Sequence, residues 1–185
     1  MEDRKPILIQ GAMRVEVKHL LEVLENQTKI EIEGYAFYKG TIDDYPVVIS
    51  ETGIGSINST ISTTIGILNF RPETVINQGI AGSYDENIHK FDVVIGTSCY
   101  NTNCYKTKRR ELGEGSNPLD WEAITFTDDD KDEKETVLQA DSYLLSVAKE
   151  ATCSYQKGNV HYGILRKRRC LEQRNRPNFM AKRKM

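Results

Sequence analysis

The sequence predicts an α/β protein whose mixed, largely parallel central sheet is flanked by helices in three layers. Two observations support this fold class. Strand-like segments alternate with helical ones along the chain, and glycine-rich turns follow two of the strand-like segments. A length of 185 residues with 38% hydrophobic side chains is sufficient for one domain with a buried core. We also expect one antiparallel hairpin near the N-terminus.

The order of elements follows from the spacing of apolar side chains. Stretches that are continuously apolar, or that alternate with a period of two, predict strands at 6–10, 29–39, 46–50, 74–77, 92–97 and 159–165. Apolar side chains three and four residues apart predict helices at 15–24, 57–69 and 140–151. The strand at 74–77 has a buried-type pattern, and Ser56 can cap the second helix. Residues 101–135 are polar and are expected to form a long loop.

The composition excludes several classes of protein. No apolar run approaches the ~18 residues that a membrane-spanning helix needs, so no membrane is expected as a partner. The cysteines lack disulfide or zinc spacing, which indicates reduced thiols in a cytoplasmic protein and no metal site. The four cysteines are Cys99, Cys104, Cys153 and Cys170. The histidines, His19, His89 and His161, are isolated in sequence and suggest no shared site.

Residues 166–185 differ in composition from the rest of the chain. They hold nine Lys or Arg and one acid, a net charge of +8, whereas the whole chain is −2 and residues 1–165 are therefore −10. This acidic balance argues against nucleic acid as a partner. Permissible codons for the segment, read one base later, can encode a Gly-rich turn followed by an amphipathic helix. We therefore expect a domain at 1–165 that lacks its C-terminal elements, followed by a basic, frameshift-like tail.

The candidate site consists of two glycine-rich turns and one acid. Residues 53–55 (Gly-Ile-Gly) and 79–82 (Gly-Ile-Ala-Gly) follow strands, and ligands of open α/β sheets bind at the carboxyl ends of strands. Glu16 lies in the first turn of the first helix, where its carboxylate would face the same edge and could deprotonate a water. Structural alternatives remain open: the turns could be ordinary connections, and Glu16 could only complement the helix dipole. Glu16 is the catalytic candidate, and the substrate-binding candidates are Gly55, Gly79, Ile80, Ala81 and Gly82.

Four motifs, in order and with matching spacing, carry a resemblance to a known family. The motifs are Gly11-Ala-Met13 with Glu16, Thr52-Gly-Ile-Gly55, Asn77-Gln-Gly79-Ile-Ala-Gly82 and Asp92-Val-Val94. Through them, residues 6–165 resemble the methylthioadenosine/S-adenosylhomocysteine nucleosidases of the purine nucleoside phosphorylase-like superfamily. The motif set is more specific for the superfamily than for the substrate.

The resemblance implies a nucleoside phosphorylase-like fold and a hydrolase. The reaction would cleave the N-glycosidic bond of 5′-methylthioadenosine or S-adenosylhomocysteine and release adenine. A glutamate matching Glu16 would activate water against the anomeric carbon, while an acid later in the family chain protonates the purine. The resemblance implies no metal and no cofactor. It also implies a homodimer in which a partner side chain closes the pocket for the 5′ group.

Three departures from the family pattern put the activity of this chain in doubt. The segment after Leu165 that contacts adenine in the family is replaced by the basic tail. The later ribose-binding and acid residues of the family have no match, and Ile80 stands where the family often has Ser or Thr. We therefore expect the chain to be impaired or inactive.

Two other functions stay open at this point. One is a phosphorolytic purine nucleoside phosphorylase relative, in which the turn at 53–55 would hold phosphate. The other is a non-catalytic binding or regulatory relative that uses the basic tail on an acidic partner.

Overall fold

The computed structural model describes residues 4–83, 85–101, 105–106, 109–114, 122–123 and 137–167. The chain divides into two compact units, residues 1–82 and 83–185, and each is described by itself. Among the described residues, no helix is long and apolar enough to cross a membrane.

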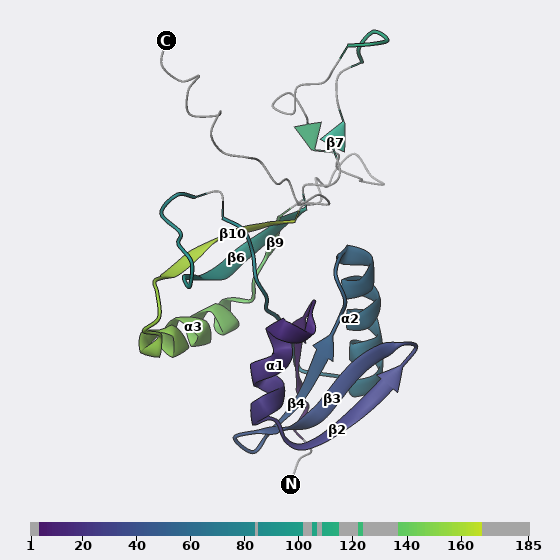
Figure 1. Cartoon of the computed structure of the whole chain (residues 1–185), viewed down its shortest axis with the longest axis vertical. Helices are drawn as coiled ribbons and strands as arrows, with labels where there is room; N and C mark the ends of the chain where they lie inside the picture. The colour runs from purple at the N-terminus through teal and green to yellow at the C-terminus, as the bar shows by residue number, and fades with distance from the viewer. Residues whose placement is uncertain are drawn as a thin grey trace. The chain divides into compact units, whose positions relative to one another are not determined.

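The first unit is a five-stranded mixed sheet that carries two helices (Figure 1). Its elements are β1 (Ile7–Gly11), α1 (Arg14–Val23), β2 (Glu25–Ile32), β3 (Tyr35–Ile42), β4 (Tyr45–Glu51), α2 (Ser56–Phe70) and β5 (Thr74–Asn77). The strand order is β2-β3-β4-β1-β5. Strand β1 pairs in parallel with β4 on one side and β5 on the other, while β2, β3 and β4 pair antiparallel.

The hydrophobic core of this unit lies on both faces of the sheet, as the three-layer prediction requires. Because successive side chains of a strand point to opposite faces, neighbours on β4 enter different clusters. Val47 and Ile49 pack with the α1 residues Val17 and Leu21, and Val48 packs in the second cluster. In that second cluster the side chains are Leu8, Phe37 and Val48, with the α2 residues Ile65 and Phe70 against them. The sheet is therefore covered by α1 on one face and by α2 on the other.

The sequence predicted one hairpin near the N-terminus, and the structure shows two. The single strand expected at 29–39 is broken by a two-residue turn at Glu33 and Gly34, with φ values of 50° and 80°. Asp43 and Asp44 form the second turn, with φ values of 49° and 60°. Two residues with positive φ match the right-handed twist of a hairpin. The prediction was wrong because the alternation of polar and apolar residues continues through the first turn, where Gly34 was the only signal.

The strand at 74–77 is β5, but it is not buried as its pattern predicted. Val75 and Ile76 are 38% and 40% exposed. Among the described strands, β5 pairs with β1 alone and so forms an edge of the five-stranded sheet. An apolar run cannot by itself distinguish a central strand from an edge strand, because both contain β-branched residues.

The second unit contains a three-stranded mixed sheet, order β10-β6-β9, and a separate two-stranded ribbon. Its elements are β6 (Val93–Asn101), β7 (Tyr105–Lys106), β8 (Glu122–Ala123), β9 (Val137–Gln139), α3 (Ser142–Ala151), a short 3₁₀ helix (Thr152–Ser154) and β10 (Val160–Lys167). Strand β10 is parallel to β6, and β9 is antiparallel to β6. The helix and the two long strands agree with the predicted ones, whereas β9 was missed because it is three residues long.

The ladder of β10 continues past the expected domain boundary at residue 165. Arg166 pairs with Tyr100 and Lys167 with Asn101 on β6. The rest of the basic tail, residues 168–185, lies outside the described residues, as does most of the loop expected at 101–135.

Candidate active site

Three loops of the first unit leave one edge of the sheet. Strands β4, β1 and β5 are neighbours and run parallel, so their carboxyl ends meet at the same edge. The amide of Thr52 donates to the carbonyl of Gly11 at 2.9 Å, and the amide of Gln78 donates to the carbonyl of Gln10 at 2.9 Å. These two bonds continue the sheet into the loops after β4 and β5. The loops therefore start from fixed positions beside the first turn of α1.

Glu16 is bound from two sides at this edge. Its Oε2 accepts a hydrogen bond from the amide of Met13 at 2.9 Å, which is the capping-box bond of α1. Its Oε1 accepts from the amide of Ile80, also at 2.9 Å, across a separation of 64 residues. Glu16 thus both caps its helix and faces the glycine-rich loop, and its catalytic role stays a prediction. Each carboxylate oxygen retains a further lone pair for a water or a substrate group.

The loop at 79–82 approaches Glu16 through its backbone. A Cβ on Gly79 would lie 2.6 Å from Oε1 of Glu16, so any residue other than glycine would displace the carboxylate. The side chain of Ile80 is 78% exposed and does not make the contact; its amide does. The hydroxyl that the family often has here is therefore not required for the bond to Glu16. Ala81 and Gly82 are exposed, and a Cβ on Gly82 would meet nothing within 4 Å.

The turn at 53–55 begins α2 without a side-chain cap. Gly53 and Gly55 have φ values of 80° and 97°, which glycine adopts without strain. Gly55 is the N-cap, and Ser56 is the first helical residue rather than the cap that the sequence predicted. Because Gly55 has no side chain, the first amides of α2 have no side-chain acceptor there and are available to an anion. No hydrogen bond joins this turn to Glu16 among the described residues.

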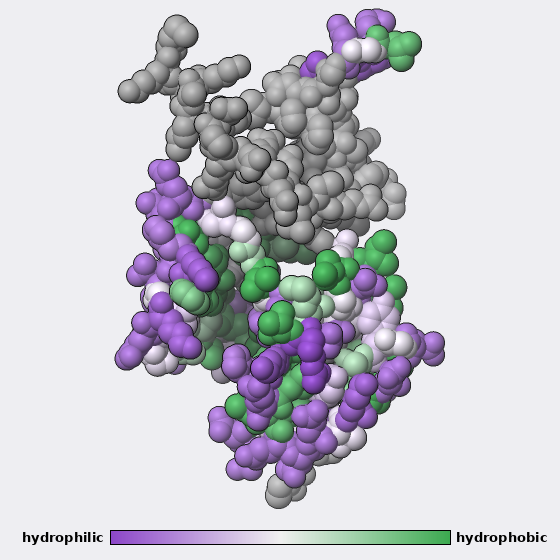
Figure 2. All heavy atoms as spheres, in the orientation of Figure 1, coloured by the Kyte–Doolittle hydropathy of each residue, from purple (hydrophilic) through white to green (hydrophobic). Residues whose placement is uncertain are grey.

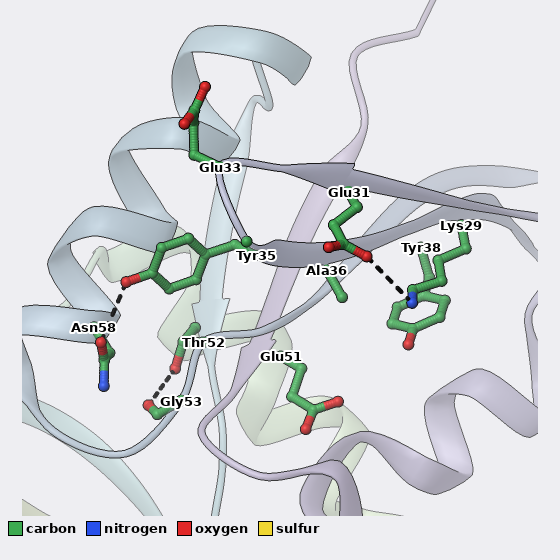
Figure 3. Close-up of a pocket in the computed structure, with 11 residues that line it drawn as sticks. Lys29, Glu31, Glu33, Tyr35, Ala36, Tyr38, Glu51, Thr52, Gly53 and Asn58 are labelled. Carbon is green, nitrogen blue, oxygen red and sulfur yellow. Dashed lines mark hydrogen bonds and ion pairs between the residues drawn. The ribbon is translucent and has the colours of Figure 1, made fainter.

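An open groove of about 650 Å³ adjoins the same turn (Figure 3). Tyr35, Glu51, Gly53 and Asn58 are among its lining residues. The hydroxyl of Tyr35 donates to Oδ1 of Asn58 at 3.2 Å, which joins β3 to the start of α2. The sequence did not identify this groove, because its walls come from β2, β3, β4 and α2.

Arg14 links α1 to the sheet close to the groove. Its Nη1 donates to the hydroxyl of Tyr38 at 2.7 Å, and the guanidinium lies 5.0 Å from the centre of the Tyr38 ring. The same nitrogen is 4.0 Å from Oε2 of Glu51. These contacts hold the first turn of α1, which contains Glu16, against β3 and β4. The sequence analysis did not identify Arg14, which is marked there only by its position two residues before Glu16.

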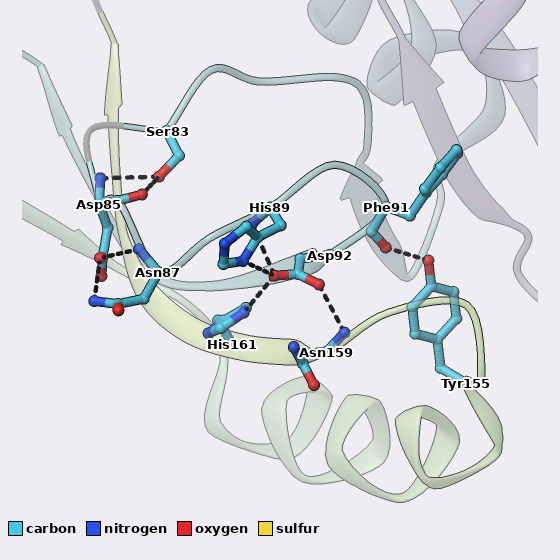
Figure 4. Close-up of polar contacts among 9 residues, drawn as sticks. All are labelled: Ser83, Asp85, Asn87, His89, Phe91, Asp92, Tyr155, Asn159 and His161. Atoms are coloured by element: carbon cyan, nitrogen blue, oxygen red, sulfur yellow. Dashed lines mark hydrogen bonds and ion pairs between the residues drawn. The ribbon is translucent and has the colours of Figure 1, made fainter.

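The second unit holds a polar cluster around Asp92, whose side chain is 4% exposed (Figure 4). Amides of His89 and Asn159 donate to its carboxylate at 2.9 and 2.8 Å, and Nε2 of His161 lies 3.0 Å from Oδ2. These contacts, led by the His89 amide, lower the pKa of Asp92 to about 2. Asp92 directly precedes β6, Asn159 directly precedes β10 and His161 lies in β10, so the cluster joins the starts of the two strands. Two histidines that were isolated in sequence thus share one carboxylate.

Among the residues that the structure describes, no three His, Cys, Asp or Glu side chains form a metal-binding group. Cys99 and Cys153 are free thiols. Cys104 and Cys170 lie outside the described residues.

Residues 6–165 match the family model of the phosphorylase superfamily. A 5′-methylthioadenosine/S-adenosylhomocysteine nucleosidase of an Exiguobacterium species is 31% identical over 157 residues, which are 85% of this chain and 61% of that protein. The nucleosidase of the same name from Anoxybacillus flavithermus is 42% identical over 91 residues, 49% of this chain and 39% of that protein. The chain thus spans between about two fifths and three fifths of the length of these relatives.

Solved structures share the fold. The nucleosidase from Neisseria meningitidis, crystallised with methylthio-immucillin-A, has a TM-score of 0.69 at 24% identity over 88% of this chain and 64% of that one. The Streptococcus pneumoniae enzyme with a transition-state inhibitor has a TM-score of 0.70 at 23% identity, with the same coverage. At these identities the likeness concerns the fold, and it agrees with the predicted α/β class.

Proposed function

Since the chain belongs to the phosphorylase superfamily, we propose that it is a nucleosidase that releases adenine from 5′-methylthioadenosine or S-adenosylhomocysteine. The observation that carries the proposal is the double anchoring of Glu16 by the amides of Met13 and Ile80. A carboxylate held in this way, at the shared carboxyl edge of parallel strands, is suited to orient and deprotonate a water.

In the proposed reaction, Glu16 accepts a proton from the water as its oxygen bonds to the anomeric carbon. The bond from that carbon to the purine nitrogen breaks, its electron pair leaves with the purine, and the purine takes up a proton from solvent to become adenine. Gly79 and Gly82 would let the ligand approach the backbone of the loop closely, together with Ile80 and Ala81. Gly55 would serve the same purpose at the start of α2.

The proposal is tested by measuring adenine release from 5′-methylthioadenosine with the purified full chain, at a protein concentration close to that of the substrate. Glu16→Gln keeps the size and one of the two accepting oxygens, gives up one of the two amide hydrogen bonds, and removes the base. It is expected to slow the reaction by about 10²–10⁴-fold. Equal rates for the two proteins, or no adenine from the wild type, would contradict the proposal. The same assay measures turnover, so it also tests the prediction that this chain is impaired.

Phosphorolysis is the second candidate, and the uncapped start of α2 supports it. Two glycines with positive φ precede the free amides of the helix, an arrangement that suits phosphate. Adenine release that rises with added phosphate, and yields a sugar 1-phosphate, would favour phosphorolysis over hydrolysis.

We also propose that the chain forms a homodimer through α2. This helix contains no charged residue, and the exposed fractions of Ile57, Ile61 and Leu68 are 68%, 42% and 71%. Figure 2 shows apolar side chains in groups between the hydrophilic ones on the visible surface. Light scattering should give twice the monomer mass, and Ile57→Glu should reduce it to that of a monomer; a monomeric wild type would refute the dimer.

The remaining parts of the proposal concern location and domain limits. The free thiols of Cys99 and Cys153 are in keeping with a cytoplasmic protein. The division into a nucleosidase domain at 1–165 and a basic tail at 166–185 stays a prediction.

A further inference from the structure

We propose that Gln78 is a positioning residue that sets the direction of the Glu16 carboxylate. The inference rests on the proposed function, because it concerns the same site. Gln78 is the first residue after β5, and its side chain is partly buried. Its Nε2 donates a hydrogen bond of 2.9 Å to the backbone carbonyl of Glu16, 62 residues away. Gln78 lies within the motif Asn77-Gln-Gly79-Ile-Ala-Gly82, but the sequence gave it no role of its own there.

The chemistry of the contact fixes how the amide is oriented. A carbonyl oxygen only accepts hydrogen bonds, so the NH₂ end of Gln78 must face Glu16, since the opposite orientation would bring two acceptors together. The carbonyl oxygen of Glu16 has two lone pairs, so it accepts this bond in addition to the one inside α1. The contact therefore adds a restraint without breaking the helix.

Gln78 is connected to both sides of the bond between the Glu16 carboxylate and the Ile80 amide. Its own amide is bound to the carbonyl of Gln10 at 2.9 Å, which ties it to β1. Its side chain holds the backbone of Glu16, and its chain neighbours Gly79 and Ile80 supply the space and the amide for Oε1. A shift of the first turn of α1 relative to this loop would change the distance from Oε1 to the Ile80 amide. Gln78 is the side chain that opposes such a shift.

Gly11 provides the space for this arrangement. A Cβ on Gly11 would lie 2.9 Å from Nε2 of Gln78 and 2.7 Å from Cγ1 of Val17. The two glycines Gly11 and Gly79 thus leave room for the Gln78 amide and for the Glu16 carboxylate respectively. Both are part of the motifs that end β1 and β5, so the positioning device lies between the two strand ends.

The test replaces the amide and keeps the shape. Gln78→Met is close in size and cannot donate, and Gln27→Met makes the same change at an exposed position of β2 as the control. In the full chain, Gln78→Met should lower kcat about 10²-fold and leave KM within about threefold, because positioning acts on the reacting geometry and not on binding. By hydrogen exchange, the Ile80 amide should lose protection by about tenfold or more, while amides of β1 and β4 keep theirs. Gln27→Met should change none of these values.

The outcomes separate this inference from the proposed function. A wild type that releases no adenine refutes the proposed function. The exchange rate of the Ile80 amide does not depend on activity, so in that case it still tests the role of Gln78. The inference is wrong if Gln78→Met leaves that amide as protected as in the wild type. It is also wrong if protection falls equally in β1 and β4, since Gln78 would then only stabilise the fold. Gln78→Ser, which is smaller and leaves space, gives the same comparison if Gln78→Met does not fold.

Discussion

Substitution of Gly79 by alanine should displace the Glu16 carboxylate without unfolding the protein. The new Cβ would lie 2.6 Å from Oε1, 3.0 Å from Cδ and 3.3 Å from Oε2 of Glu16. Gly79 is not among the residues with positive φ, so its backbone accepts alanine without strain. The atoms in the way belong to the end of a flexible side chain, and this end can move. The perturbation is therefore a local one, aimed at a single carboxylate.

The displacement of the Glu16 carboxylate determines how large the effects on stability and activity should be. Ordinary van der Waals contact begins at 3.4 Å, so Oε1 must retreat by roughly 0.8 Å, away from the loop that contains the Ile80 amide. The present bond of 2.9 Å between that amide and Oε1 would be lost or strongly lengthened. A hydrogen bond to a charged group contributes about 1.5–3 kcal/mol, and the partial exposure of Glu16 reduces this to about 1–2 kcal/mol. A misplacement of this size in a catalytic group costs about 10²-fold in rate.

The assay combines urea unfolding with adenine release, and Gly163→Ala in β10 is the matched control. At Gly163, which is not a residue of the proposed site, the added Cβ meets nothing within 4 Å. That variant should be as stable as the wild type, or more stable by about 0.4–1 kcal/mol, because alanine restricts the unfolded chain. It should also retain its activity. Gly79→Ala should lose stability and activity relative to both proteins.

A double-mutant cycle tests whether the clash with Glu16 is the cause. In a Glu16→Ala background the carboxylate is gone, so Gly79→Ala should no longer destabilise the protein. If Gly79→Ala costs the same free energy of unfolding in both backgrounds, the contact with Glu16 is not the reason for glycine at this position.

Two further predictions concern stability. Because the pKa of Asp92 is lowered from 3.8 to about 2, its contribution is complete above the unfolded value and is lost as the pH falls through the folded one. The difference in free energy of unfolding between wild type and Asp92→Asn should thus shrink from about pH 5 to pH 2; a constant difference in urea titrations would refute this. Gln10 is 2% exposed; its Oε1 accepts from the hydroxyl of Thr63 at 3.0 Å, whereas its Nε2 has no hydrogen-bond partner among the described residues. Because the Thr63 hydroxyl also donates to the carbonyl of Ser59, Gln10→Met should lose little at Thr63 and stabilise the protein by up to about 1 kcal/mol. A lower unfolding midpoint for Gln10→Met would show that its amide is satisfied.

Much of the fold could be predicted because it depends on local patterns. The helix α1 follows from the spacing of Val17, Leu20 and Leu21, and its Glu16 from a position in the first turn. The hairpin between β2 and β3 could not be found in this way, because alternation with a period of two continues across a turn as short as Glu33-Gly34. The exposure of β5 was missed for a related reason, since a strand's own residues do not record how many neighbours it has.

The candidate site shows the same contrast between what neighbouring residues determine and what tertiary contacts determine. By itself, the sequence determined that an acid stands in the first turn of α1 and that a glycine-rich loop follows β5, since both depend on neighbouring residues. Only the tertiary structure decided that they meet, because the order β4-β1-β5 is set by pairing between distant segments. It also decided how they meet: the amide of Ile80 and the side chain of Gln78 hold Glu16. Because every residue except proline has the same backbone N–H, no pattern of side chains could have predicted the bond from the Ile80 amide.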